Sequence, residues 1–256
     1  QATALELARR GAQLWLTDIN ATGLEQTAEQ VKALGAQCQT FVGNVSSSTD
    51  MKKLAKAVHE QHPALDILIN NAGIGVAGRF VDTTLKTWNK VLDVNVKGVM
   101  LGCHVFAPNM ISQGGGHIVN VASAAAFIAA KDMPVYAMSK YAVLGFSEAL
   151  RADLYDHGIG VSAVCPGVIN TAIVANTLFE GSVGNNDTVK NKVVEFYKKR
   201  NYTADKVALG IIDAIEHNLA VRPISPEAWA MYLAKRWLPG VVDWVGRRDL
   251  PFMAAD

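Results

Sequence analysis

Cysteine is scarce in this sequence. Its three cysteines, Cys38, Cys103 and Cys165, lie far apart and form no C-x-x-C pair. This spacing provides neither a disulfide framework nor a zinc-binding pattern. We therefore expect buried, reduced thiols in a cytoplasmic protein.

An excess of charge of either sign is also missing. Lys and Arg number 24 against 23 Asp and Glu, which leaves a net charge of +1. A broad nucleic-acid-binding surface needs clustered basic residues, so we expect no nucleic-acid partner. His59 and His62 come just before Pro63 and are typical of a solvated helix end, so we expect no metal site.

Long apolar runs are absent as well, and none reaches the ~20 residues that a membrane-spanning helix needs. What is present is a composition suited to a folded core. Of 256 residues, 50% are hydrophobic and only 18% are charged, which is typical of a globular chain and not of a disordered one. The length is ample for one large α/β domain.

Short apolar strands alternate along the chain with helical stretches of ten or more residues. This alternation predicts a doubly wound parallel sheet in a Rossmann-like three-layer α/β/α architecture. No linker or repeat divides the chain, so we expect one domain over residues 1–256. The expected strands are 13–18, 38–42, 66–70, 117–121 and 160–165, and the expected helices include 21–34, 48–61, 84–112 and 134–156.

One section, residues 168–202, breaks this alternation. It follows an expected strand, and ligands bind at the carboxyl ends of the strands in doubly wound sheets. Irregular segments of this length are usually functional. We expect residues 168–202 to form a lid over the substrate.

Tyr136 and Lys140 are four residues apart in an expected helix and so share one face, with Ser123 upstream of them. A phenol has an ordinary pKa of about 10, and a nearby ammonium group favours the phenolate. Such a pair could exchange a proton with an alcohol or a carbonyl, while the serine hydroxyl holds the same oxygen. Y-x-x-x-K alone also occurs by chance on amphipathic helices.

Further motifs accompany this pair. Asn70-Asn-Ala-Gly73 follows a strand, Asn95-Val-Lys-Gly98 lies in the long helical stretch, Asp18 ends a strand, and Pro166-Gly-Val-Ile-Asn-Thr171 follows another strand. In this order and spacing, and together with Ser123, Tyr136 and Lys140, they resemble the short-chain dehydrogenase/reductase family over about residues 1–225.

The resemblance implies hydride transfer between a substrate carbon and a nicotinamide. Tyr136 would be the general acid/base, Lys140 would lower the pKa of Tyr136 and hold the nicotinamide ribose, and Ser123 would bind the reacting oxygen. Asn95, at a helix irregularity, would hold a water that links Lys140 to solvent. The other residues implied to contact the cofactor are Asp18, Asn44, Val45, Asn71, Ala72, Gly73, Pro166, Gly167, Ile169 and Thr171.

Asp18 indicates NAD over NADP. A carboxylate at this strand end can bind both ribose hydroxyls of NAD and repel the 2′-phosphate of NADP. The alternative is that Asp18 only caps the helix that begins near Ala21. Ile19 and Asn20 supply no basic group that would accept a phosphate.

The sequence departs from the family pattern in two places. Asn44-Val45 stands where the family usually has Asp-Val, and the asparagine oxygen could accept the same hydrogen bond from the adenine. The glycine-rich turn that admits the pyrophosphate, and the central strand before it, are not in the sequence. Because Asp18 lies only 17 residues after Gln1, we expect both to precede Gln1 and the sequence to be an excerpt.

Residues 226–256 form an aromatic and basic C-terminal extension. It contains Trp229, Trp237 and Trp244 among Lys and Arg residues. The preferred interpretation is packing against a second subunit in a homo-oligomer, a dimer or a tetramer. Packing on its own domain and docking on a membrane surface are the alternatives.

The sequence thus predicts an NAD-dependent alcohol dehydrogenase or carbonyl reductase that acts on a small molecule. Apolar residues flank the catalytic positions and indicate a lipophilic secondary alcohol or ketone, although the same residues could equally belong to the core: Ala124-Ala-Ala-Phe-Ile128, Met133, Val135, Val168, Ile169, Ile173 and Val174. An isomerase or dehydratase on the same scaffold is a second enzyme hypothesis. A catalytically silent dinucleotide-binding or assembly protein is the hypothesis from another class.

Overall fold

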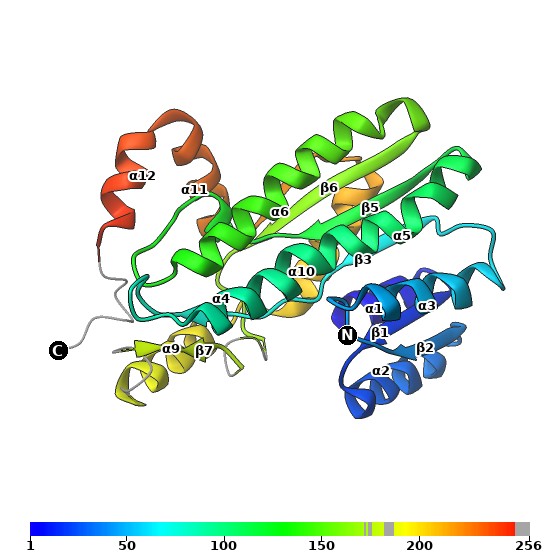
Figure 1. The fold of residues 1–256 in the computed structure, drawn as a ribbon, viewed down its shortest axis with the longest axis horizontal. Coiled ribbons are helices and arrows are strands. Elements are labelled where there is room, and N and C mark those ends of the chain that lie inside the picture. The colour runs from blue at the N-terminus through cyan, green and yellow to red at the C-terminus, as the bar shows by residue number, and fades with distance from the viewer. Residues whose placement is uncertain (172, 174–175, 182–186, 249–256) are drawn as a thin grey trace.

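The computed structural model describes residues 1–171, 173, 176–181 and 187–248, and its central feature is a parallel sheet between two layers of helices (Figure 1). Val174 and parts of the predicted lid (172, 174–175 and 182–186) lie outside the described residues, as do residues 249–256 of the C-terminal extension. The sheet contains β1 (Leu14–Asp18), β2 (Cys38–Val42), β3 (Ile67–Asn70), β5 (Gly116–Val121), β6 (Ile159–Pro166) and β8 (Val221–Ile224).

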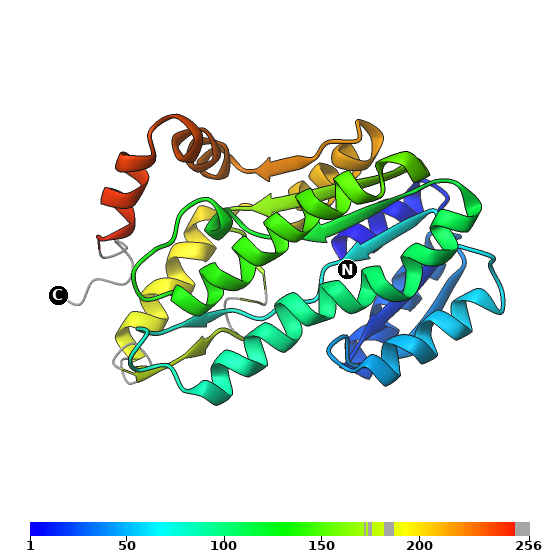
Figure 2. The same cartoon turned by 45° about the horizontal axis from the view of Figure 1, so that its top comes forward.

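Helices cover both faces of this sheet, which confirms the predicted Rossmann-like α/β fold (Figure 2). On one face, α3 (Ser48–His59), α5 (Gly98–Gln113) and α6 (Pro134–Asp153) pack in the largest apolar cluster, around Phe106, Met110 and Ile118. On the other face lie α1 (Ala2–Arg9), α2 (Ala21–Ala33) and α10 (Ala204–Glu216). The strands of the middle of the sheet are therefore buried on both sides, as expected for a parallel sheet.

The sheet has two hydrogen-bonded parts. β1 pairs with β2, and the order of the other part is β3-β5-β6-β8, all parallel. A cavity of about 1360 Å³ lies between them and is lined by residues of both β1 and β3.

The polypeptide between residues 84 and 113 is not one regular helix. It consists of α4 (Leu85–Leu92), a π-helical segment (Asp93–Lys97) and α5. A π-helical turn has one extra residue per hydrogen-bonded ring and is frequent at functional sites. The segment contains Asn95, so the irregularity that the resemblance implied at this residue is confirmed.

Smaller elements complete the carboxyl end of the sheet. β4 (Val76–Ala77) pairs with β7 (Leu178–Phe179), which belongs to the predicted lid. The helix α9 (Asp187–Arg200) follows in the same region, and α11 (Pro226–Trp237) and α12 (Pro239–Gly246) end the described chain. Within the described residues, no helix has both the length and the apolar character needed to cross a bilayer.

Helix ends follow local sequence rules. Asn20 caps α2, because its side-chain oxygen accepts a hydrogen bond from the backbone N–H of Gly23 at 3.1 Å. Ser47 caps α3 in the same way through the N–H of Asp50. The C-terminal end of α5 is at Gly114, whose φ of 81° suits glycine and few other residues.

The close approach of α5 to β3 gives a stability prediction. A Cβ on Gly102 would lie 2.1 Å from Oδ1 of Asn70, so Gly102→Ala must displace the Asn70 amide, which donates a hydrogen bond to Asn120, or push the helix away from the sheet. Such overpacking should lower the free energy of unfolding by about 1–3 kcal/mol, measured by urea denaturation.

Gly145 in α6 is the matched control. A Cβ there meets nothing within 4 Å, so Gly145→Ala should be neutral or stabilise the protein by about 0.5–1 kcal/mol. Equal effects of the two substitutions would contradict the packing described here.

Candidate active site

The three residues expected to handle the proton meet at the carboxyl end of β5. Ser123 follows that strand and caps a short 3₁₀ turn through the N–H of Ala125 at 3.1 Å. Tyr136 and Lys140 lie in the first turns of α6, which begins at Pro134. The side chains of Ser123 and Tyr136 are hydrogen-bonded to each other. The Lys140 Nζ lies 5.8 Å from the centre of the Tyr136 ring.

Lys140 is held by the sheet. Its Nζ donates a hydrogen bond to the carbonyl oxygen of Val121, the last residue of β5, at 2.9 Å. The residue is only 4% exposed, and no ion pair within the described part of the chain offsets its charge. The ammonium group is therefore fixed in position, and its removal from water is energetically unfavourable.

Burial dominates the protonation behaviour of this pair. It raises the pKa of Tyr136 above its ordinary value, while the hydrogen bond with Ser123 acts in the opposite direction. It also lowers the pKa of Lys140 to about 8. Lys140 is not among the causes of the shift at Tyr136, so the expected lowering of the pKa of Tyr136 by Lys140 is not seen in this structure, where desolvation of the phenol raises that pKa.

Asn95 is completely buried and its amide connects three segments. Its Oδ1 accepts a hydrogen bond from the N–H of Ile74 at 2.8 Å, and its Nδ2 donates to the carbonyl of Ile74 at 3.0 Å. Nδ2 also donates to Oγ of Ser139, next to Lys140 in α6, at 3.1 Å. The amide is thus occupied by protein groups, and a water held at Asn95 remains a prediction.

Asp18 lies at the carboxyl end of β1, and its side chain is not the cap of α2. Asn20 is that cap, while Oδ1 of Asp18 accepts a hydrogen bond from the N–H of Asn20 at 2.9 Å. The capping alternative is therefore wrong. Asp18 is exposed at the carboxyl end of β1, so its carboxylate is accessible to a ligand.

Asn44, which was expected to bind the adenine, makes other hydrogen bonds in this structure. Oδ1 of Asn44 accepts hydrogen bonds from the backbone N–H of Ser46 at 3.0 Å and from its hydroxyl at 2.8 Å. The oxygen expected to bind adenine is therefore already engaged in a local turn. Val45, by contrast, lines the large cavity and packs close to Gly98.

The loop after β3 runs from the cavity to the proton-handling residues. Asn71 and Ala72 line the cavity. Gly73 lies against the catalytic positions, because a Cβ there would be 3.4 Å from Oδ1 of Asn95 and 3.5 Å from Nζ of Lys140. The structure thus brings these loop residues to both parts of the predicted cofactor site.

Pro166 ends β6, and the loop that follows contains Gly167, Ile169 and Thr171. This loop is fixed by a carboxylate that the sequence pattern did not single out. Oε1 of Glu227 accepts a hydrogen bond from the N–H of Val168 at 3.1 Å. Oε2 of the same residue accepts one from Arg200 at 2.9 Å. Arg200 ends α9, so Glu227 joins the loop to the base of the predicted lid.

Tyr197 is a second phenol close to the catalytic one and was also missed. Burial raises its pKa to about 12, and the charges of Tyr136 and Glu227 act in the same direction. The residue packs with Ile173, Phe179 and Val193 in an apolar cluster of the lid. Its position in a basic helical segment carried no signal in the sequence, because only the tertiary fold brings α9 over α6.

Some predicted substrate-lining residues are core residues instead. Ala124 and Phe127 belong to the large apolar cluster, and Val135 packs with Val76 and Val91. All three are at most 6% exposed. These three residues pack in the core beneath the site and do not line its surface.

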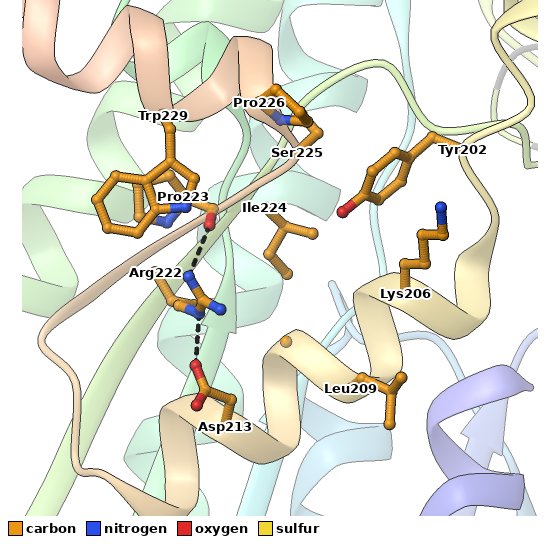
Figure 3. A pocket seen from close by; sticks show the side chains of 11 residues that line it. Tyr202, Lys206, Leu209, Asp213, Arg222, Pro223, Ile224, Ser225, Pro226 and Trp229 are labelled. Carbon is orange, nitrogen blue, oxygen red and sulfur yellow. Dashed lines mark hydrogen bonds and ion pairs between the residues drawn. The ribbon is translucent and has the colours of Figure 1, made fainter.

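A second cavity, of about 470 Å³, lies beside the start of the loop after β6, because Ile224 lines it and accepts a hydrogen bond from the N–H of Gly167 at 3.0 Å. It is lined by Tyr202, Lys206, Asp213, Arg222 and Trp229 among others (Figure 3). Arg222 is held by Asp213 and faces the ring of Trp229, with 5.7 Å between guanidinium carbon and ring centre.

Comparison with known proteins decides the family of this site. The model of the family described as short chain dehydrogenase matches residues 1–180. The chain belongs to the short-chain dehydrogenase/reductase family. The motifs that carried the resemblance in the sequence are those assembled here.

This short-chain dehydrogenase is similar to two curated proteins and one solved structure in particular. It is 39% identical to the probable oxidoreductase EphD of Mycobacterium tuberculosis over 93% of its own length, but it spans only 41% of that protein. It is 32% identical to a cyclohexanol dehydrogenase of an Acinetobacter species, covering 68% of this chain and 70% of the relative. A short-chain dehydrogenase/reductase of Burkholderia phymatum, solved in complex with NAD, superposes with a TM-score of 0.84 at 28% identity, covering 98% and 92% of the two chains.

The donor set of the dehydrogenase fits two parts of a nicotinamide dinucleotide. The exposed Asp18 carboxylate beside the large cavity suits ribose hydroxyls, and the ammonium of Lys140 beside Tyr136 suits the other ribose. Among the described residues, no cluster of His, Cys, Asp and Glu could hold a metal ion.

The buried lysine predicts a pH-dependent stability. Its pKa is about 8 in the folded protein against an ordinary 10.5, so the unfolded chain binds more protons between these values. The burial cost is fully present below pH 8 and disappears as the pH rises through 10.5. The free energy of unfolding of the wild type relative to Lys140→Met should therefore rise by roughly 1–3 kcal/mol between pH 8 and pH 10.5.

Urea denaturation of both proteins at several pH values measures this difference. Lys53→Met, at an exposed position of α3, is the control for the loss of a lysine. A difference between wild type and Lys140→Met that stays constant over this pH range would show that the ammonium is not desolvated.

Proposed function

We propose that this protein is an NAD-dependent alcohol dehydrogenase or carbonyl reductase in which Tyr136 is the general acid/base. The observation that carries the proposal is the contact of the Tyr136 and Ser123 hydroxyls beside the buried ammonium of Lys140. Two hydroxyl groups of different acidity meet at one point, where a single substrate oxygen could contact both.

In this mechanism each residue has a separate task. The Ser123 hydroxyl donates a hydrogen bond to the substrate oxygen and stabilises the charge that develops there. Tyr136 gives its proton to that oxygen in reduction or takes the proton in oxidation. When bound, the nicotinamide supplies or accepts the hydride.

Lys140 and Asn95 maintain the geometry for proton transfer. The Lys140 ammonium stabilises the phenolate form of Tyr136, and the burial of both groups strengthens this attraction because the local dielectric constant is low. Asn95 keeps the loop at Ile74 and the first turns of α6 in register through Ser139. We also propose that residues 71–73 and 166–171 contact the cofactor.

A lipophilic secondary alcohol or ketone is the proposed substrate class. The lid cluster of Ile173, Phe179, Val193 and Tyr197 offers apolar contacts near Tyr136. The similarity to a cyclohexanol dehydrogenase supports the same class. A homo-oligomer and a cytoplasmic location are also proposed, the second on the basis of three free cysteines.

Tyr136→Phe tests the proton-transfer role. We expect a loss of about 10²- to 10⁴-fold in kcat, because the phenol proton is gone while the ring still packs. The measurement is the absorbance of reduced nicotinamide with cyclohexanol and related secondary alcohols.

Tyr141→Phe, in the same helix, is the matched control and should retain activity. Unchanged turnover by Tyr136→Phe would exclude this residue as the acid/base. If the wild type binds NADH but converts no alcohol or ketone of the panel, the silent dinucleotide-binding hypothesis is favoured instead.

Asp18 provides the test of cofactor preference. At ~4 Å and an effective dielectric constant of ~20, its carboxylate would repel the 2′-phosphate of NADP by about 4 kcal/mol before screening. Asp18→Asn should therefore reduce the preference for NADH over NADPH by at least about tenfold in dissociation constants. Glu25→Gln, an exposed carboxylate of α2, should leave the ratio unchanged, and the same ratio in all three proteins would sink this role of Asp18.

A further inference from the structure

The C-terminal helices present large apolar side chains to solvent. α11 and α12 lie together at one end of the molecule, outside the layers that cover the sheet (Figure 1, Figure 2). The side chains in question form what we term the C-terminal patch: Leu233, Trp237, Leu238, Val241 and Trp244. Trp237 is 75% exposed and Trp244 is 56% exposed.

The C-terminal patch is not simply the unpacked side of a core. α11 and α12 do bury residues against their own domain, including Ala228 and Val242. Tyr232 contacts the Phe127 ring with 5.1 Å between ring centres. The helices thus have an inner face that is satisfied and an outer face that remains apolar, so packing on the same domain does not account for the outer tryptophans.

Basic side chains accompany the C-terminal patch. Lys235, Arg236 and Arg248 have no ion pair with a carboxylate within the described residues, and each lies instead near an aromatic ring. The guanidinium carbon of Arg248 is 3.9 Å from the centre of the Trp244 ring. The one exposed acid of α12, Asp243, is already paired with Arg247. Within the described residues from α11 to Arg248, the side chains of Lys235, Arg236 and Arg248 therefore place positive charge beside exposed tryptophans.

This charge helps to decide which of two partners binds the C-terminal patch: a second copy of the chain or a lipid surface. A symmetric pair of subunits would place the same surface of each copy against the other, and among the described residues α12 offers the unpaired basic groups only Asp243, which is already paired with Arg247. A surface with anionic headgroups would instead neutralise them, and tryptophan is enriched at the boundary between lipid headgroups and acyl chains. The combination of basic and aromatic side chains fits an anionic lipid surface better than a second copy.

We propose that the C-terminal patch docks this protein on the surface of a lipid membrane rich in anionic headgroups. Trp237 and Trp244 enter the headgroup region, while Lys235, Arg236 and Arg248 contact the anionic groups. Docking of this kind is peripheral, in keeping with helices that lie along a surface and do not cross it. The inference does not depend on the reaction proposed above.

The docked face is also connected to the catalytic loop. The N–H of Lys131 donates a hydrogen bond to the carbonyl of Gly246, the last residue of α12, at 2.9 Å. A Cβ on Gly246 would be only 2.5 Å from the carbonyl oxygen of Ala129, so this approach requires glycine. Residues 129–131 lie between Ser123 and Tyr136, and docking would therefore bring the catalytic end of the sheet close to the lipid.

The same end of the molecule has a further apolar element. Asp132 forms an ion pair with Arg79 at 3.1 Å, and the neighbouring Phe80 and Val81 are 68% and 83% exposed. The loop between β4 and α4 and the helix α12 appear at this end in both views (Figure 1, Figure 2). These side chains add to the apolar rim next to the C-terminal patch.

Flotation with lipid vesicles tests the proposal on the full chain. We expect the protein to float with vesicles that contain phosphatidylglycerol and not with vesicles of phosphatidylcholine alone. Binding should weaken as salt is raised from ~0.1 M to ~1 M, because the Debye length falls from about 10 Å to about 3 Å. Lys235→Glu/Arg236→Glu and Trp237→Ser/Trp244→Ser should each lower the partition coefficient by more than about tenfold.

Matched controls replace residues of the same kind elsewhere. Tyr155→Ser removes an aromatic side chain that is 77% exposed beyond the far end of α6, and Lys52→Glu/Lys53→Glu reverses two exposed charges on α3. Both should bind like the wild type, and thermal unfolding should confirm that all variants fold.

Three results would overturn the proposal. The first is no flotation of the wild type, and the second is equal flotation with both kinds of vesicle. The third is a loss of binding in the controls as large as in the variants of the C-terminal patch. If the wild type does not float and Trp237→Ser/Trp244→Ser lowers the mass of the particle in light scattering, the occupant is a second copy of the chain.

Discussion

The Asn95 amide is the interaction on which the geometry of the catalytic end depends. It binds both backbone groups of Ile74 and the Ser139 hydroxyl, and so joins the loop after β3 to α6. The amide can reach both only because the helix opens into a π-helical turn at this residue. A regular helix from Leu85 to Gln113 would place position 95 elsewhere on the helix surface. Strain or irregularity in the backbone is thus retained where it orients functional groups.

Burial produces the second constraint. Lys140 and Tyr136 are both removed from water, which disfavours the charged form of each group. The same desolvation strengthens the attraction between an ammonium and a phenolate once both exist. The backbone carbonyl of Val121 gives the buried ammonium of Lys140 a fixed hydrogen-bond partner in place of water. The burial of these two groups is a local conflict between stability and chemistry of the kind expected at an active site.

Much of the fold and of the catalytic cluster could be predicted from the sequence, because both depend on local patterns. Strand and helix periodicity gave the Rossmann-like architecture, and the spacing of Tyr136 and Lys140 placed both on one helix face. The residues that were missed act through tertiary contacts. Glu227 and Arg200 form a hydrogen bond although they are 27 residues apart in the sequence. Tyr197 lies near Tyr136 because the predicted lid folds back to that position. The sequence left open whether Phe127 lines the site or belongs to the core, because both positions favour an apolar residue, and the structure places it in the core.

The hydrogen bond from Lys131 to Gly246 has a consequence for regulation. It makes the last turn of α12 part of the same mechanical unit as the segment that leads into the catalytic helix. Thermodynamic linkage is reciprocal, so any occupant of the outer helices that favours one arrangement of residues 129–133 changes the affinity of the catalytic end for its ligands by a certain factor. Ligands at the catalytic end must then change the affinity of the outer helices by the same factor. Ligand binding at the catalytic end and binding of a partner to the outer helices would then be thermodynamically coupled.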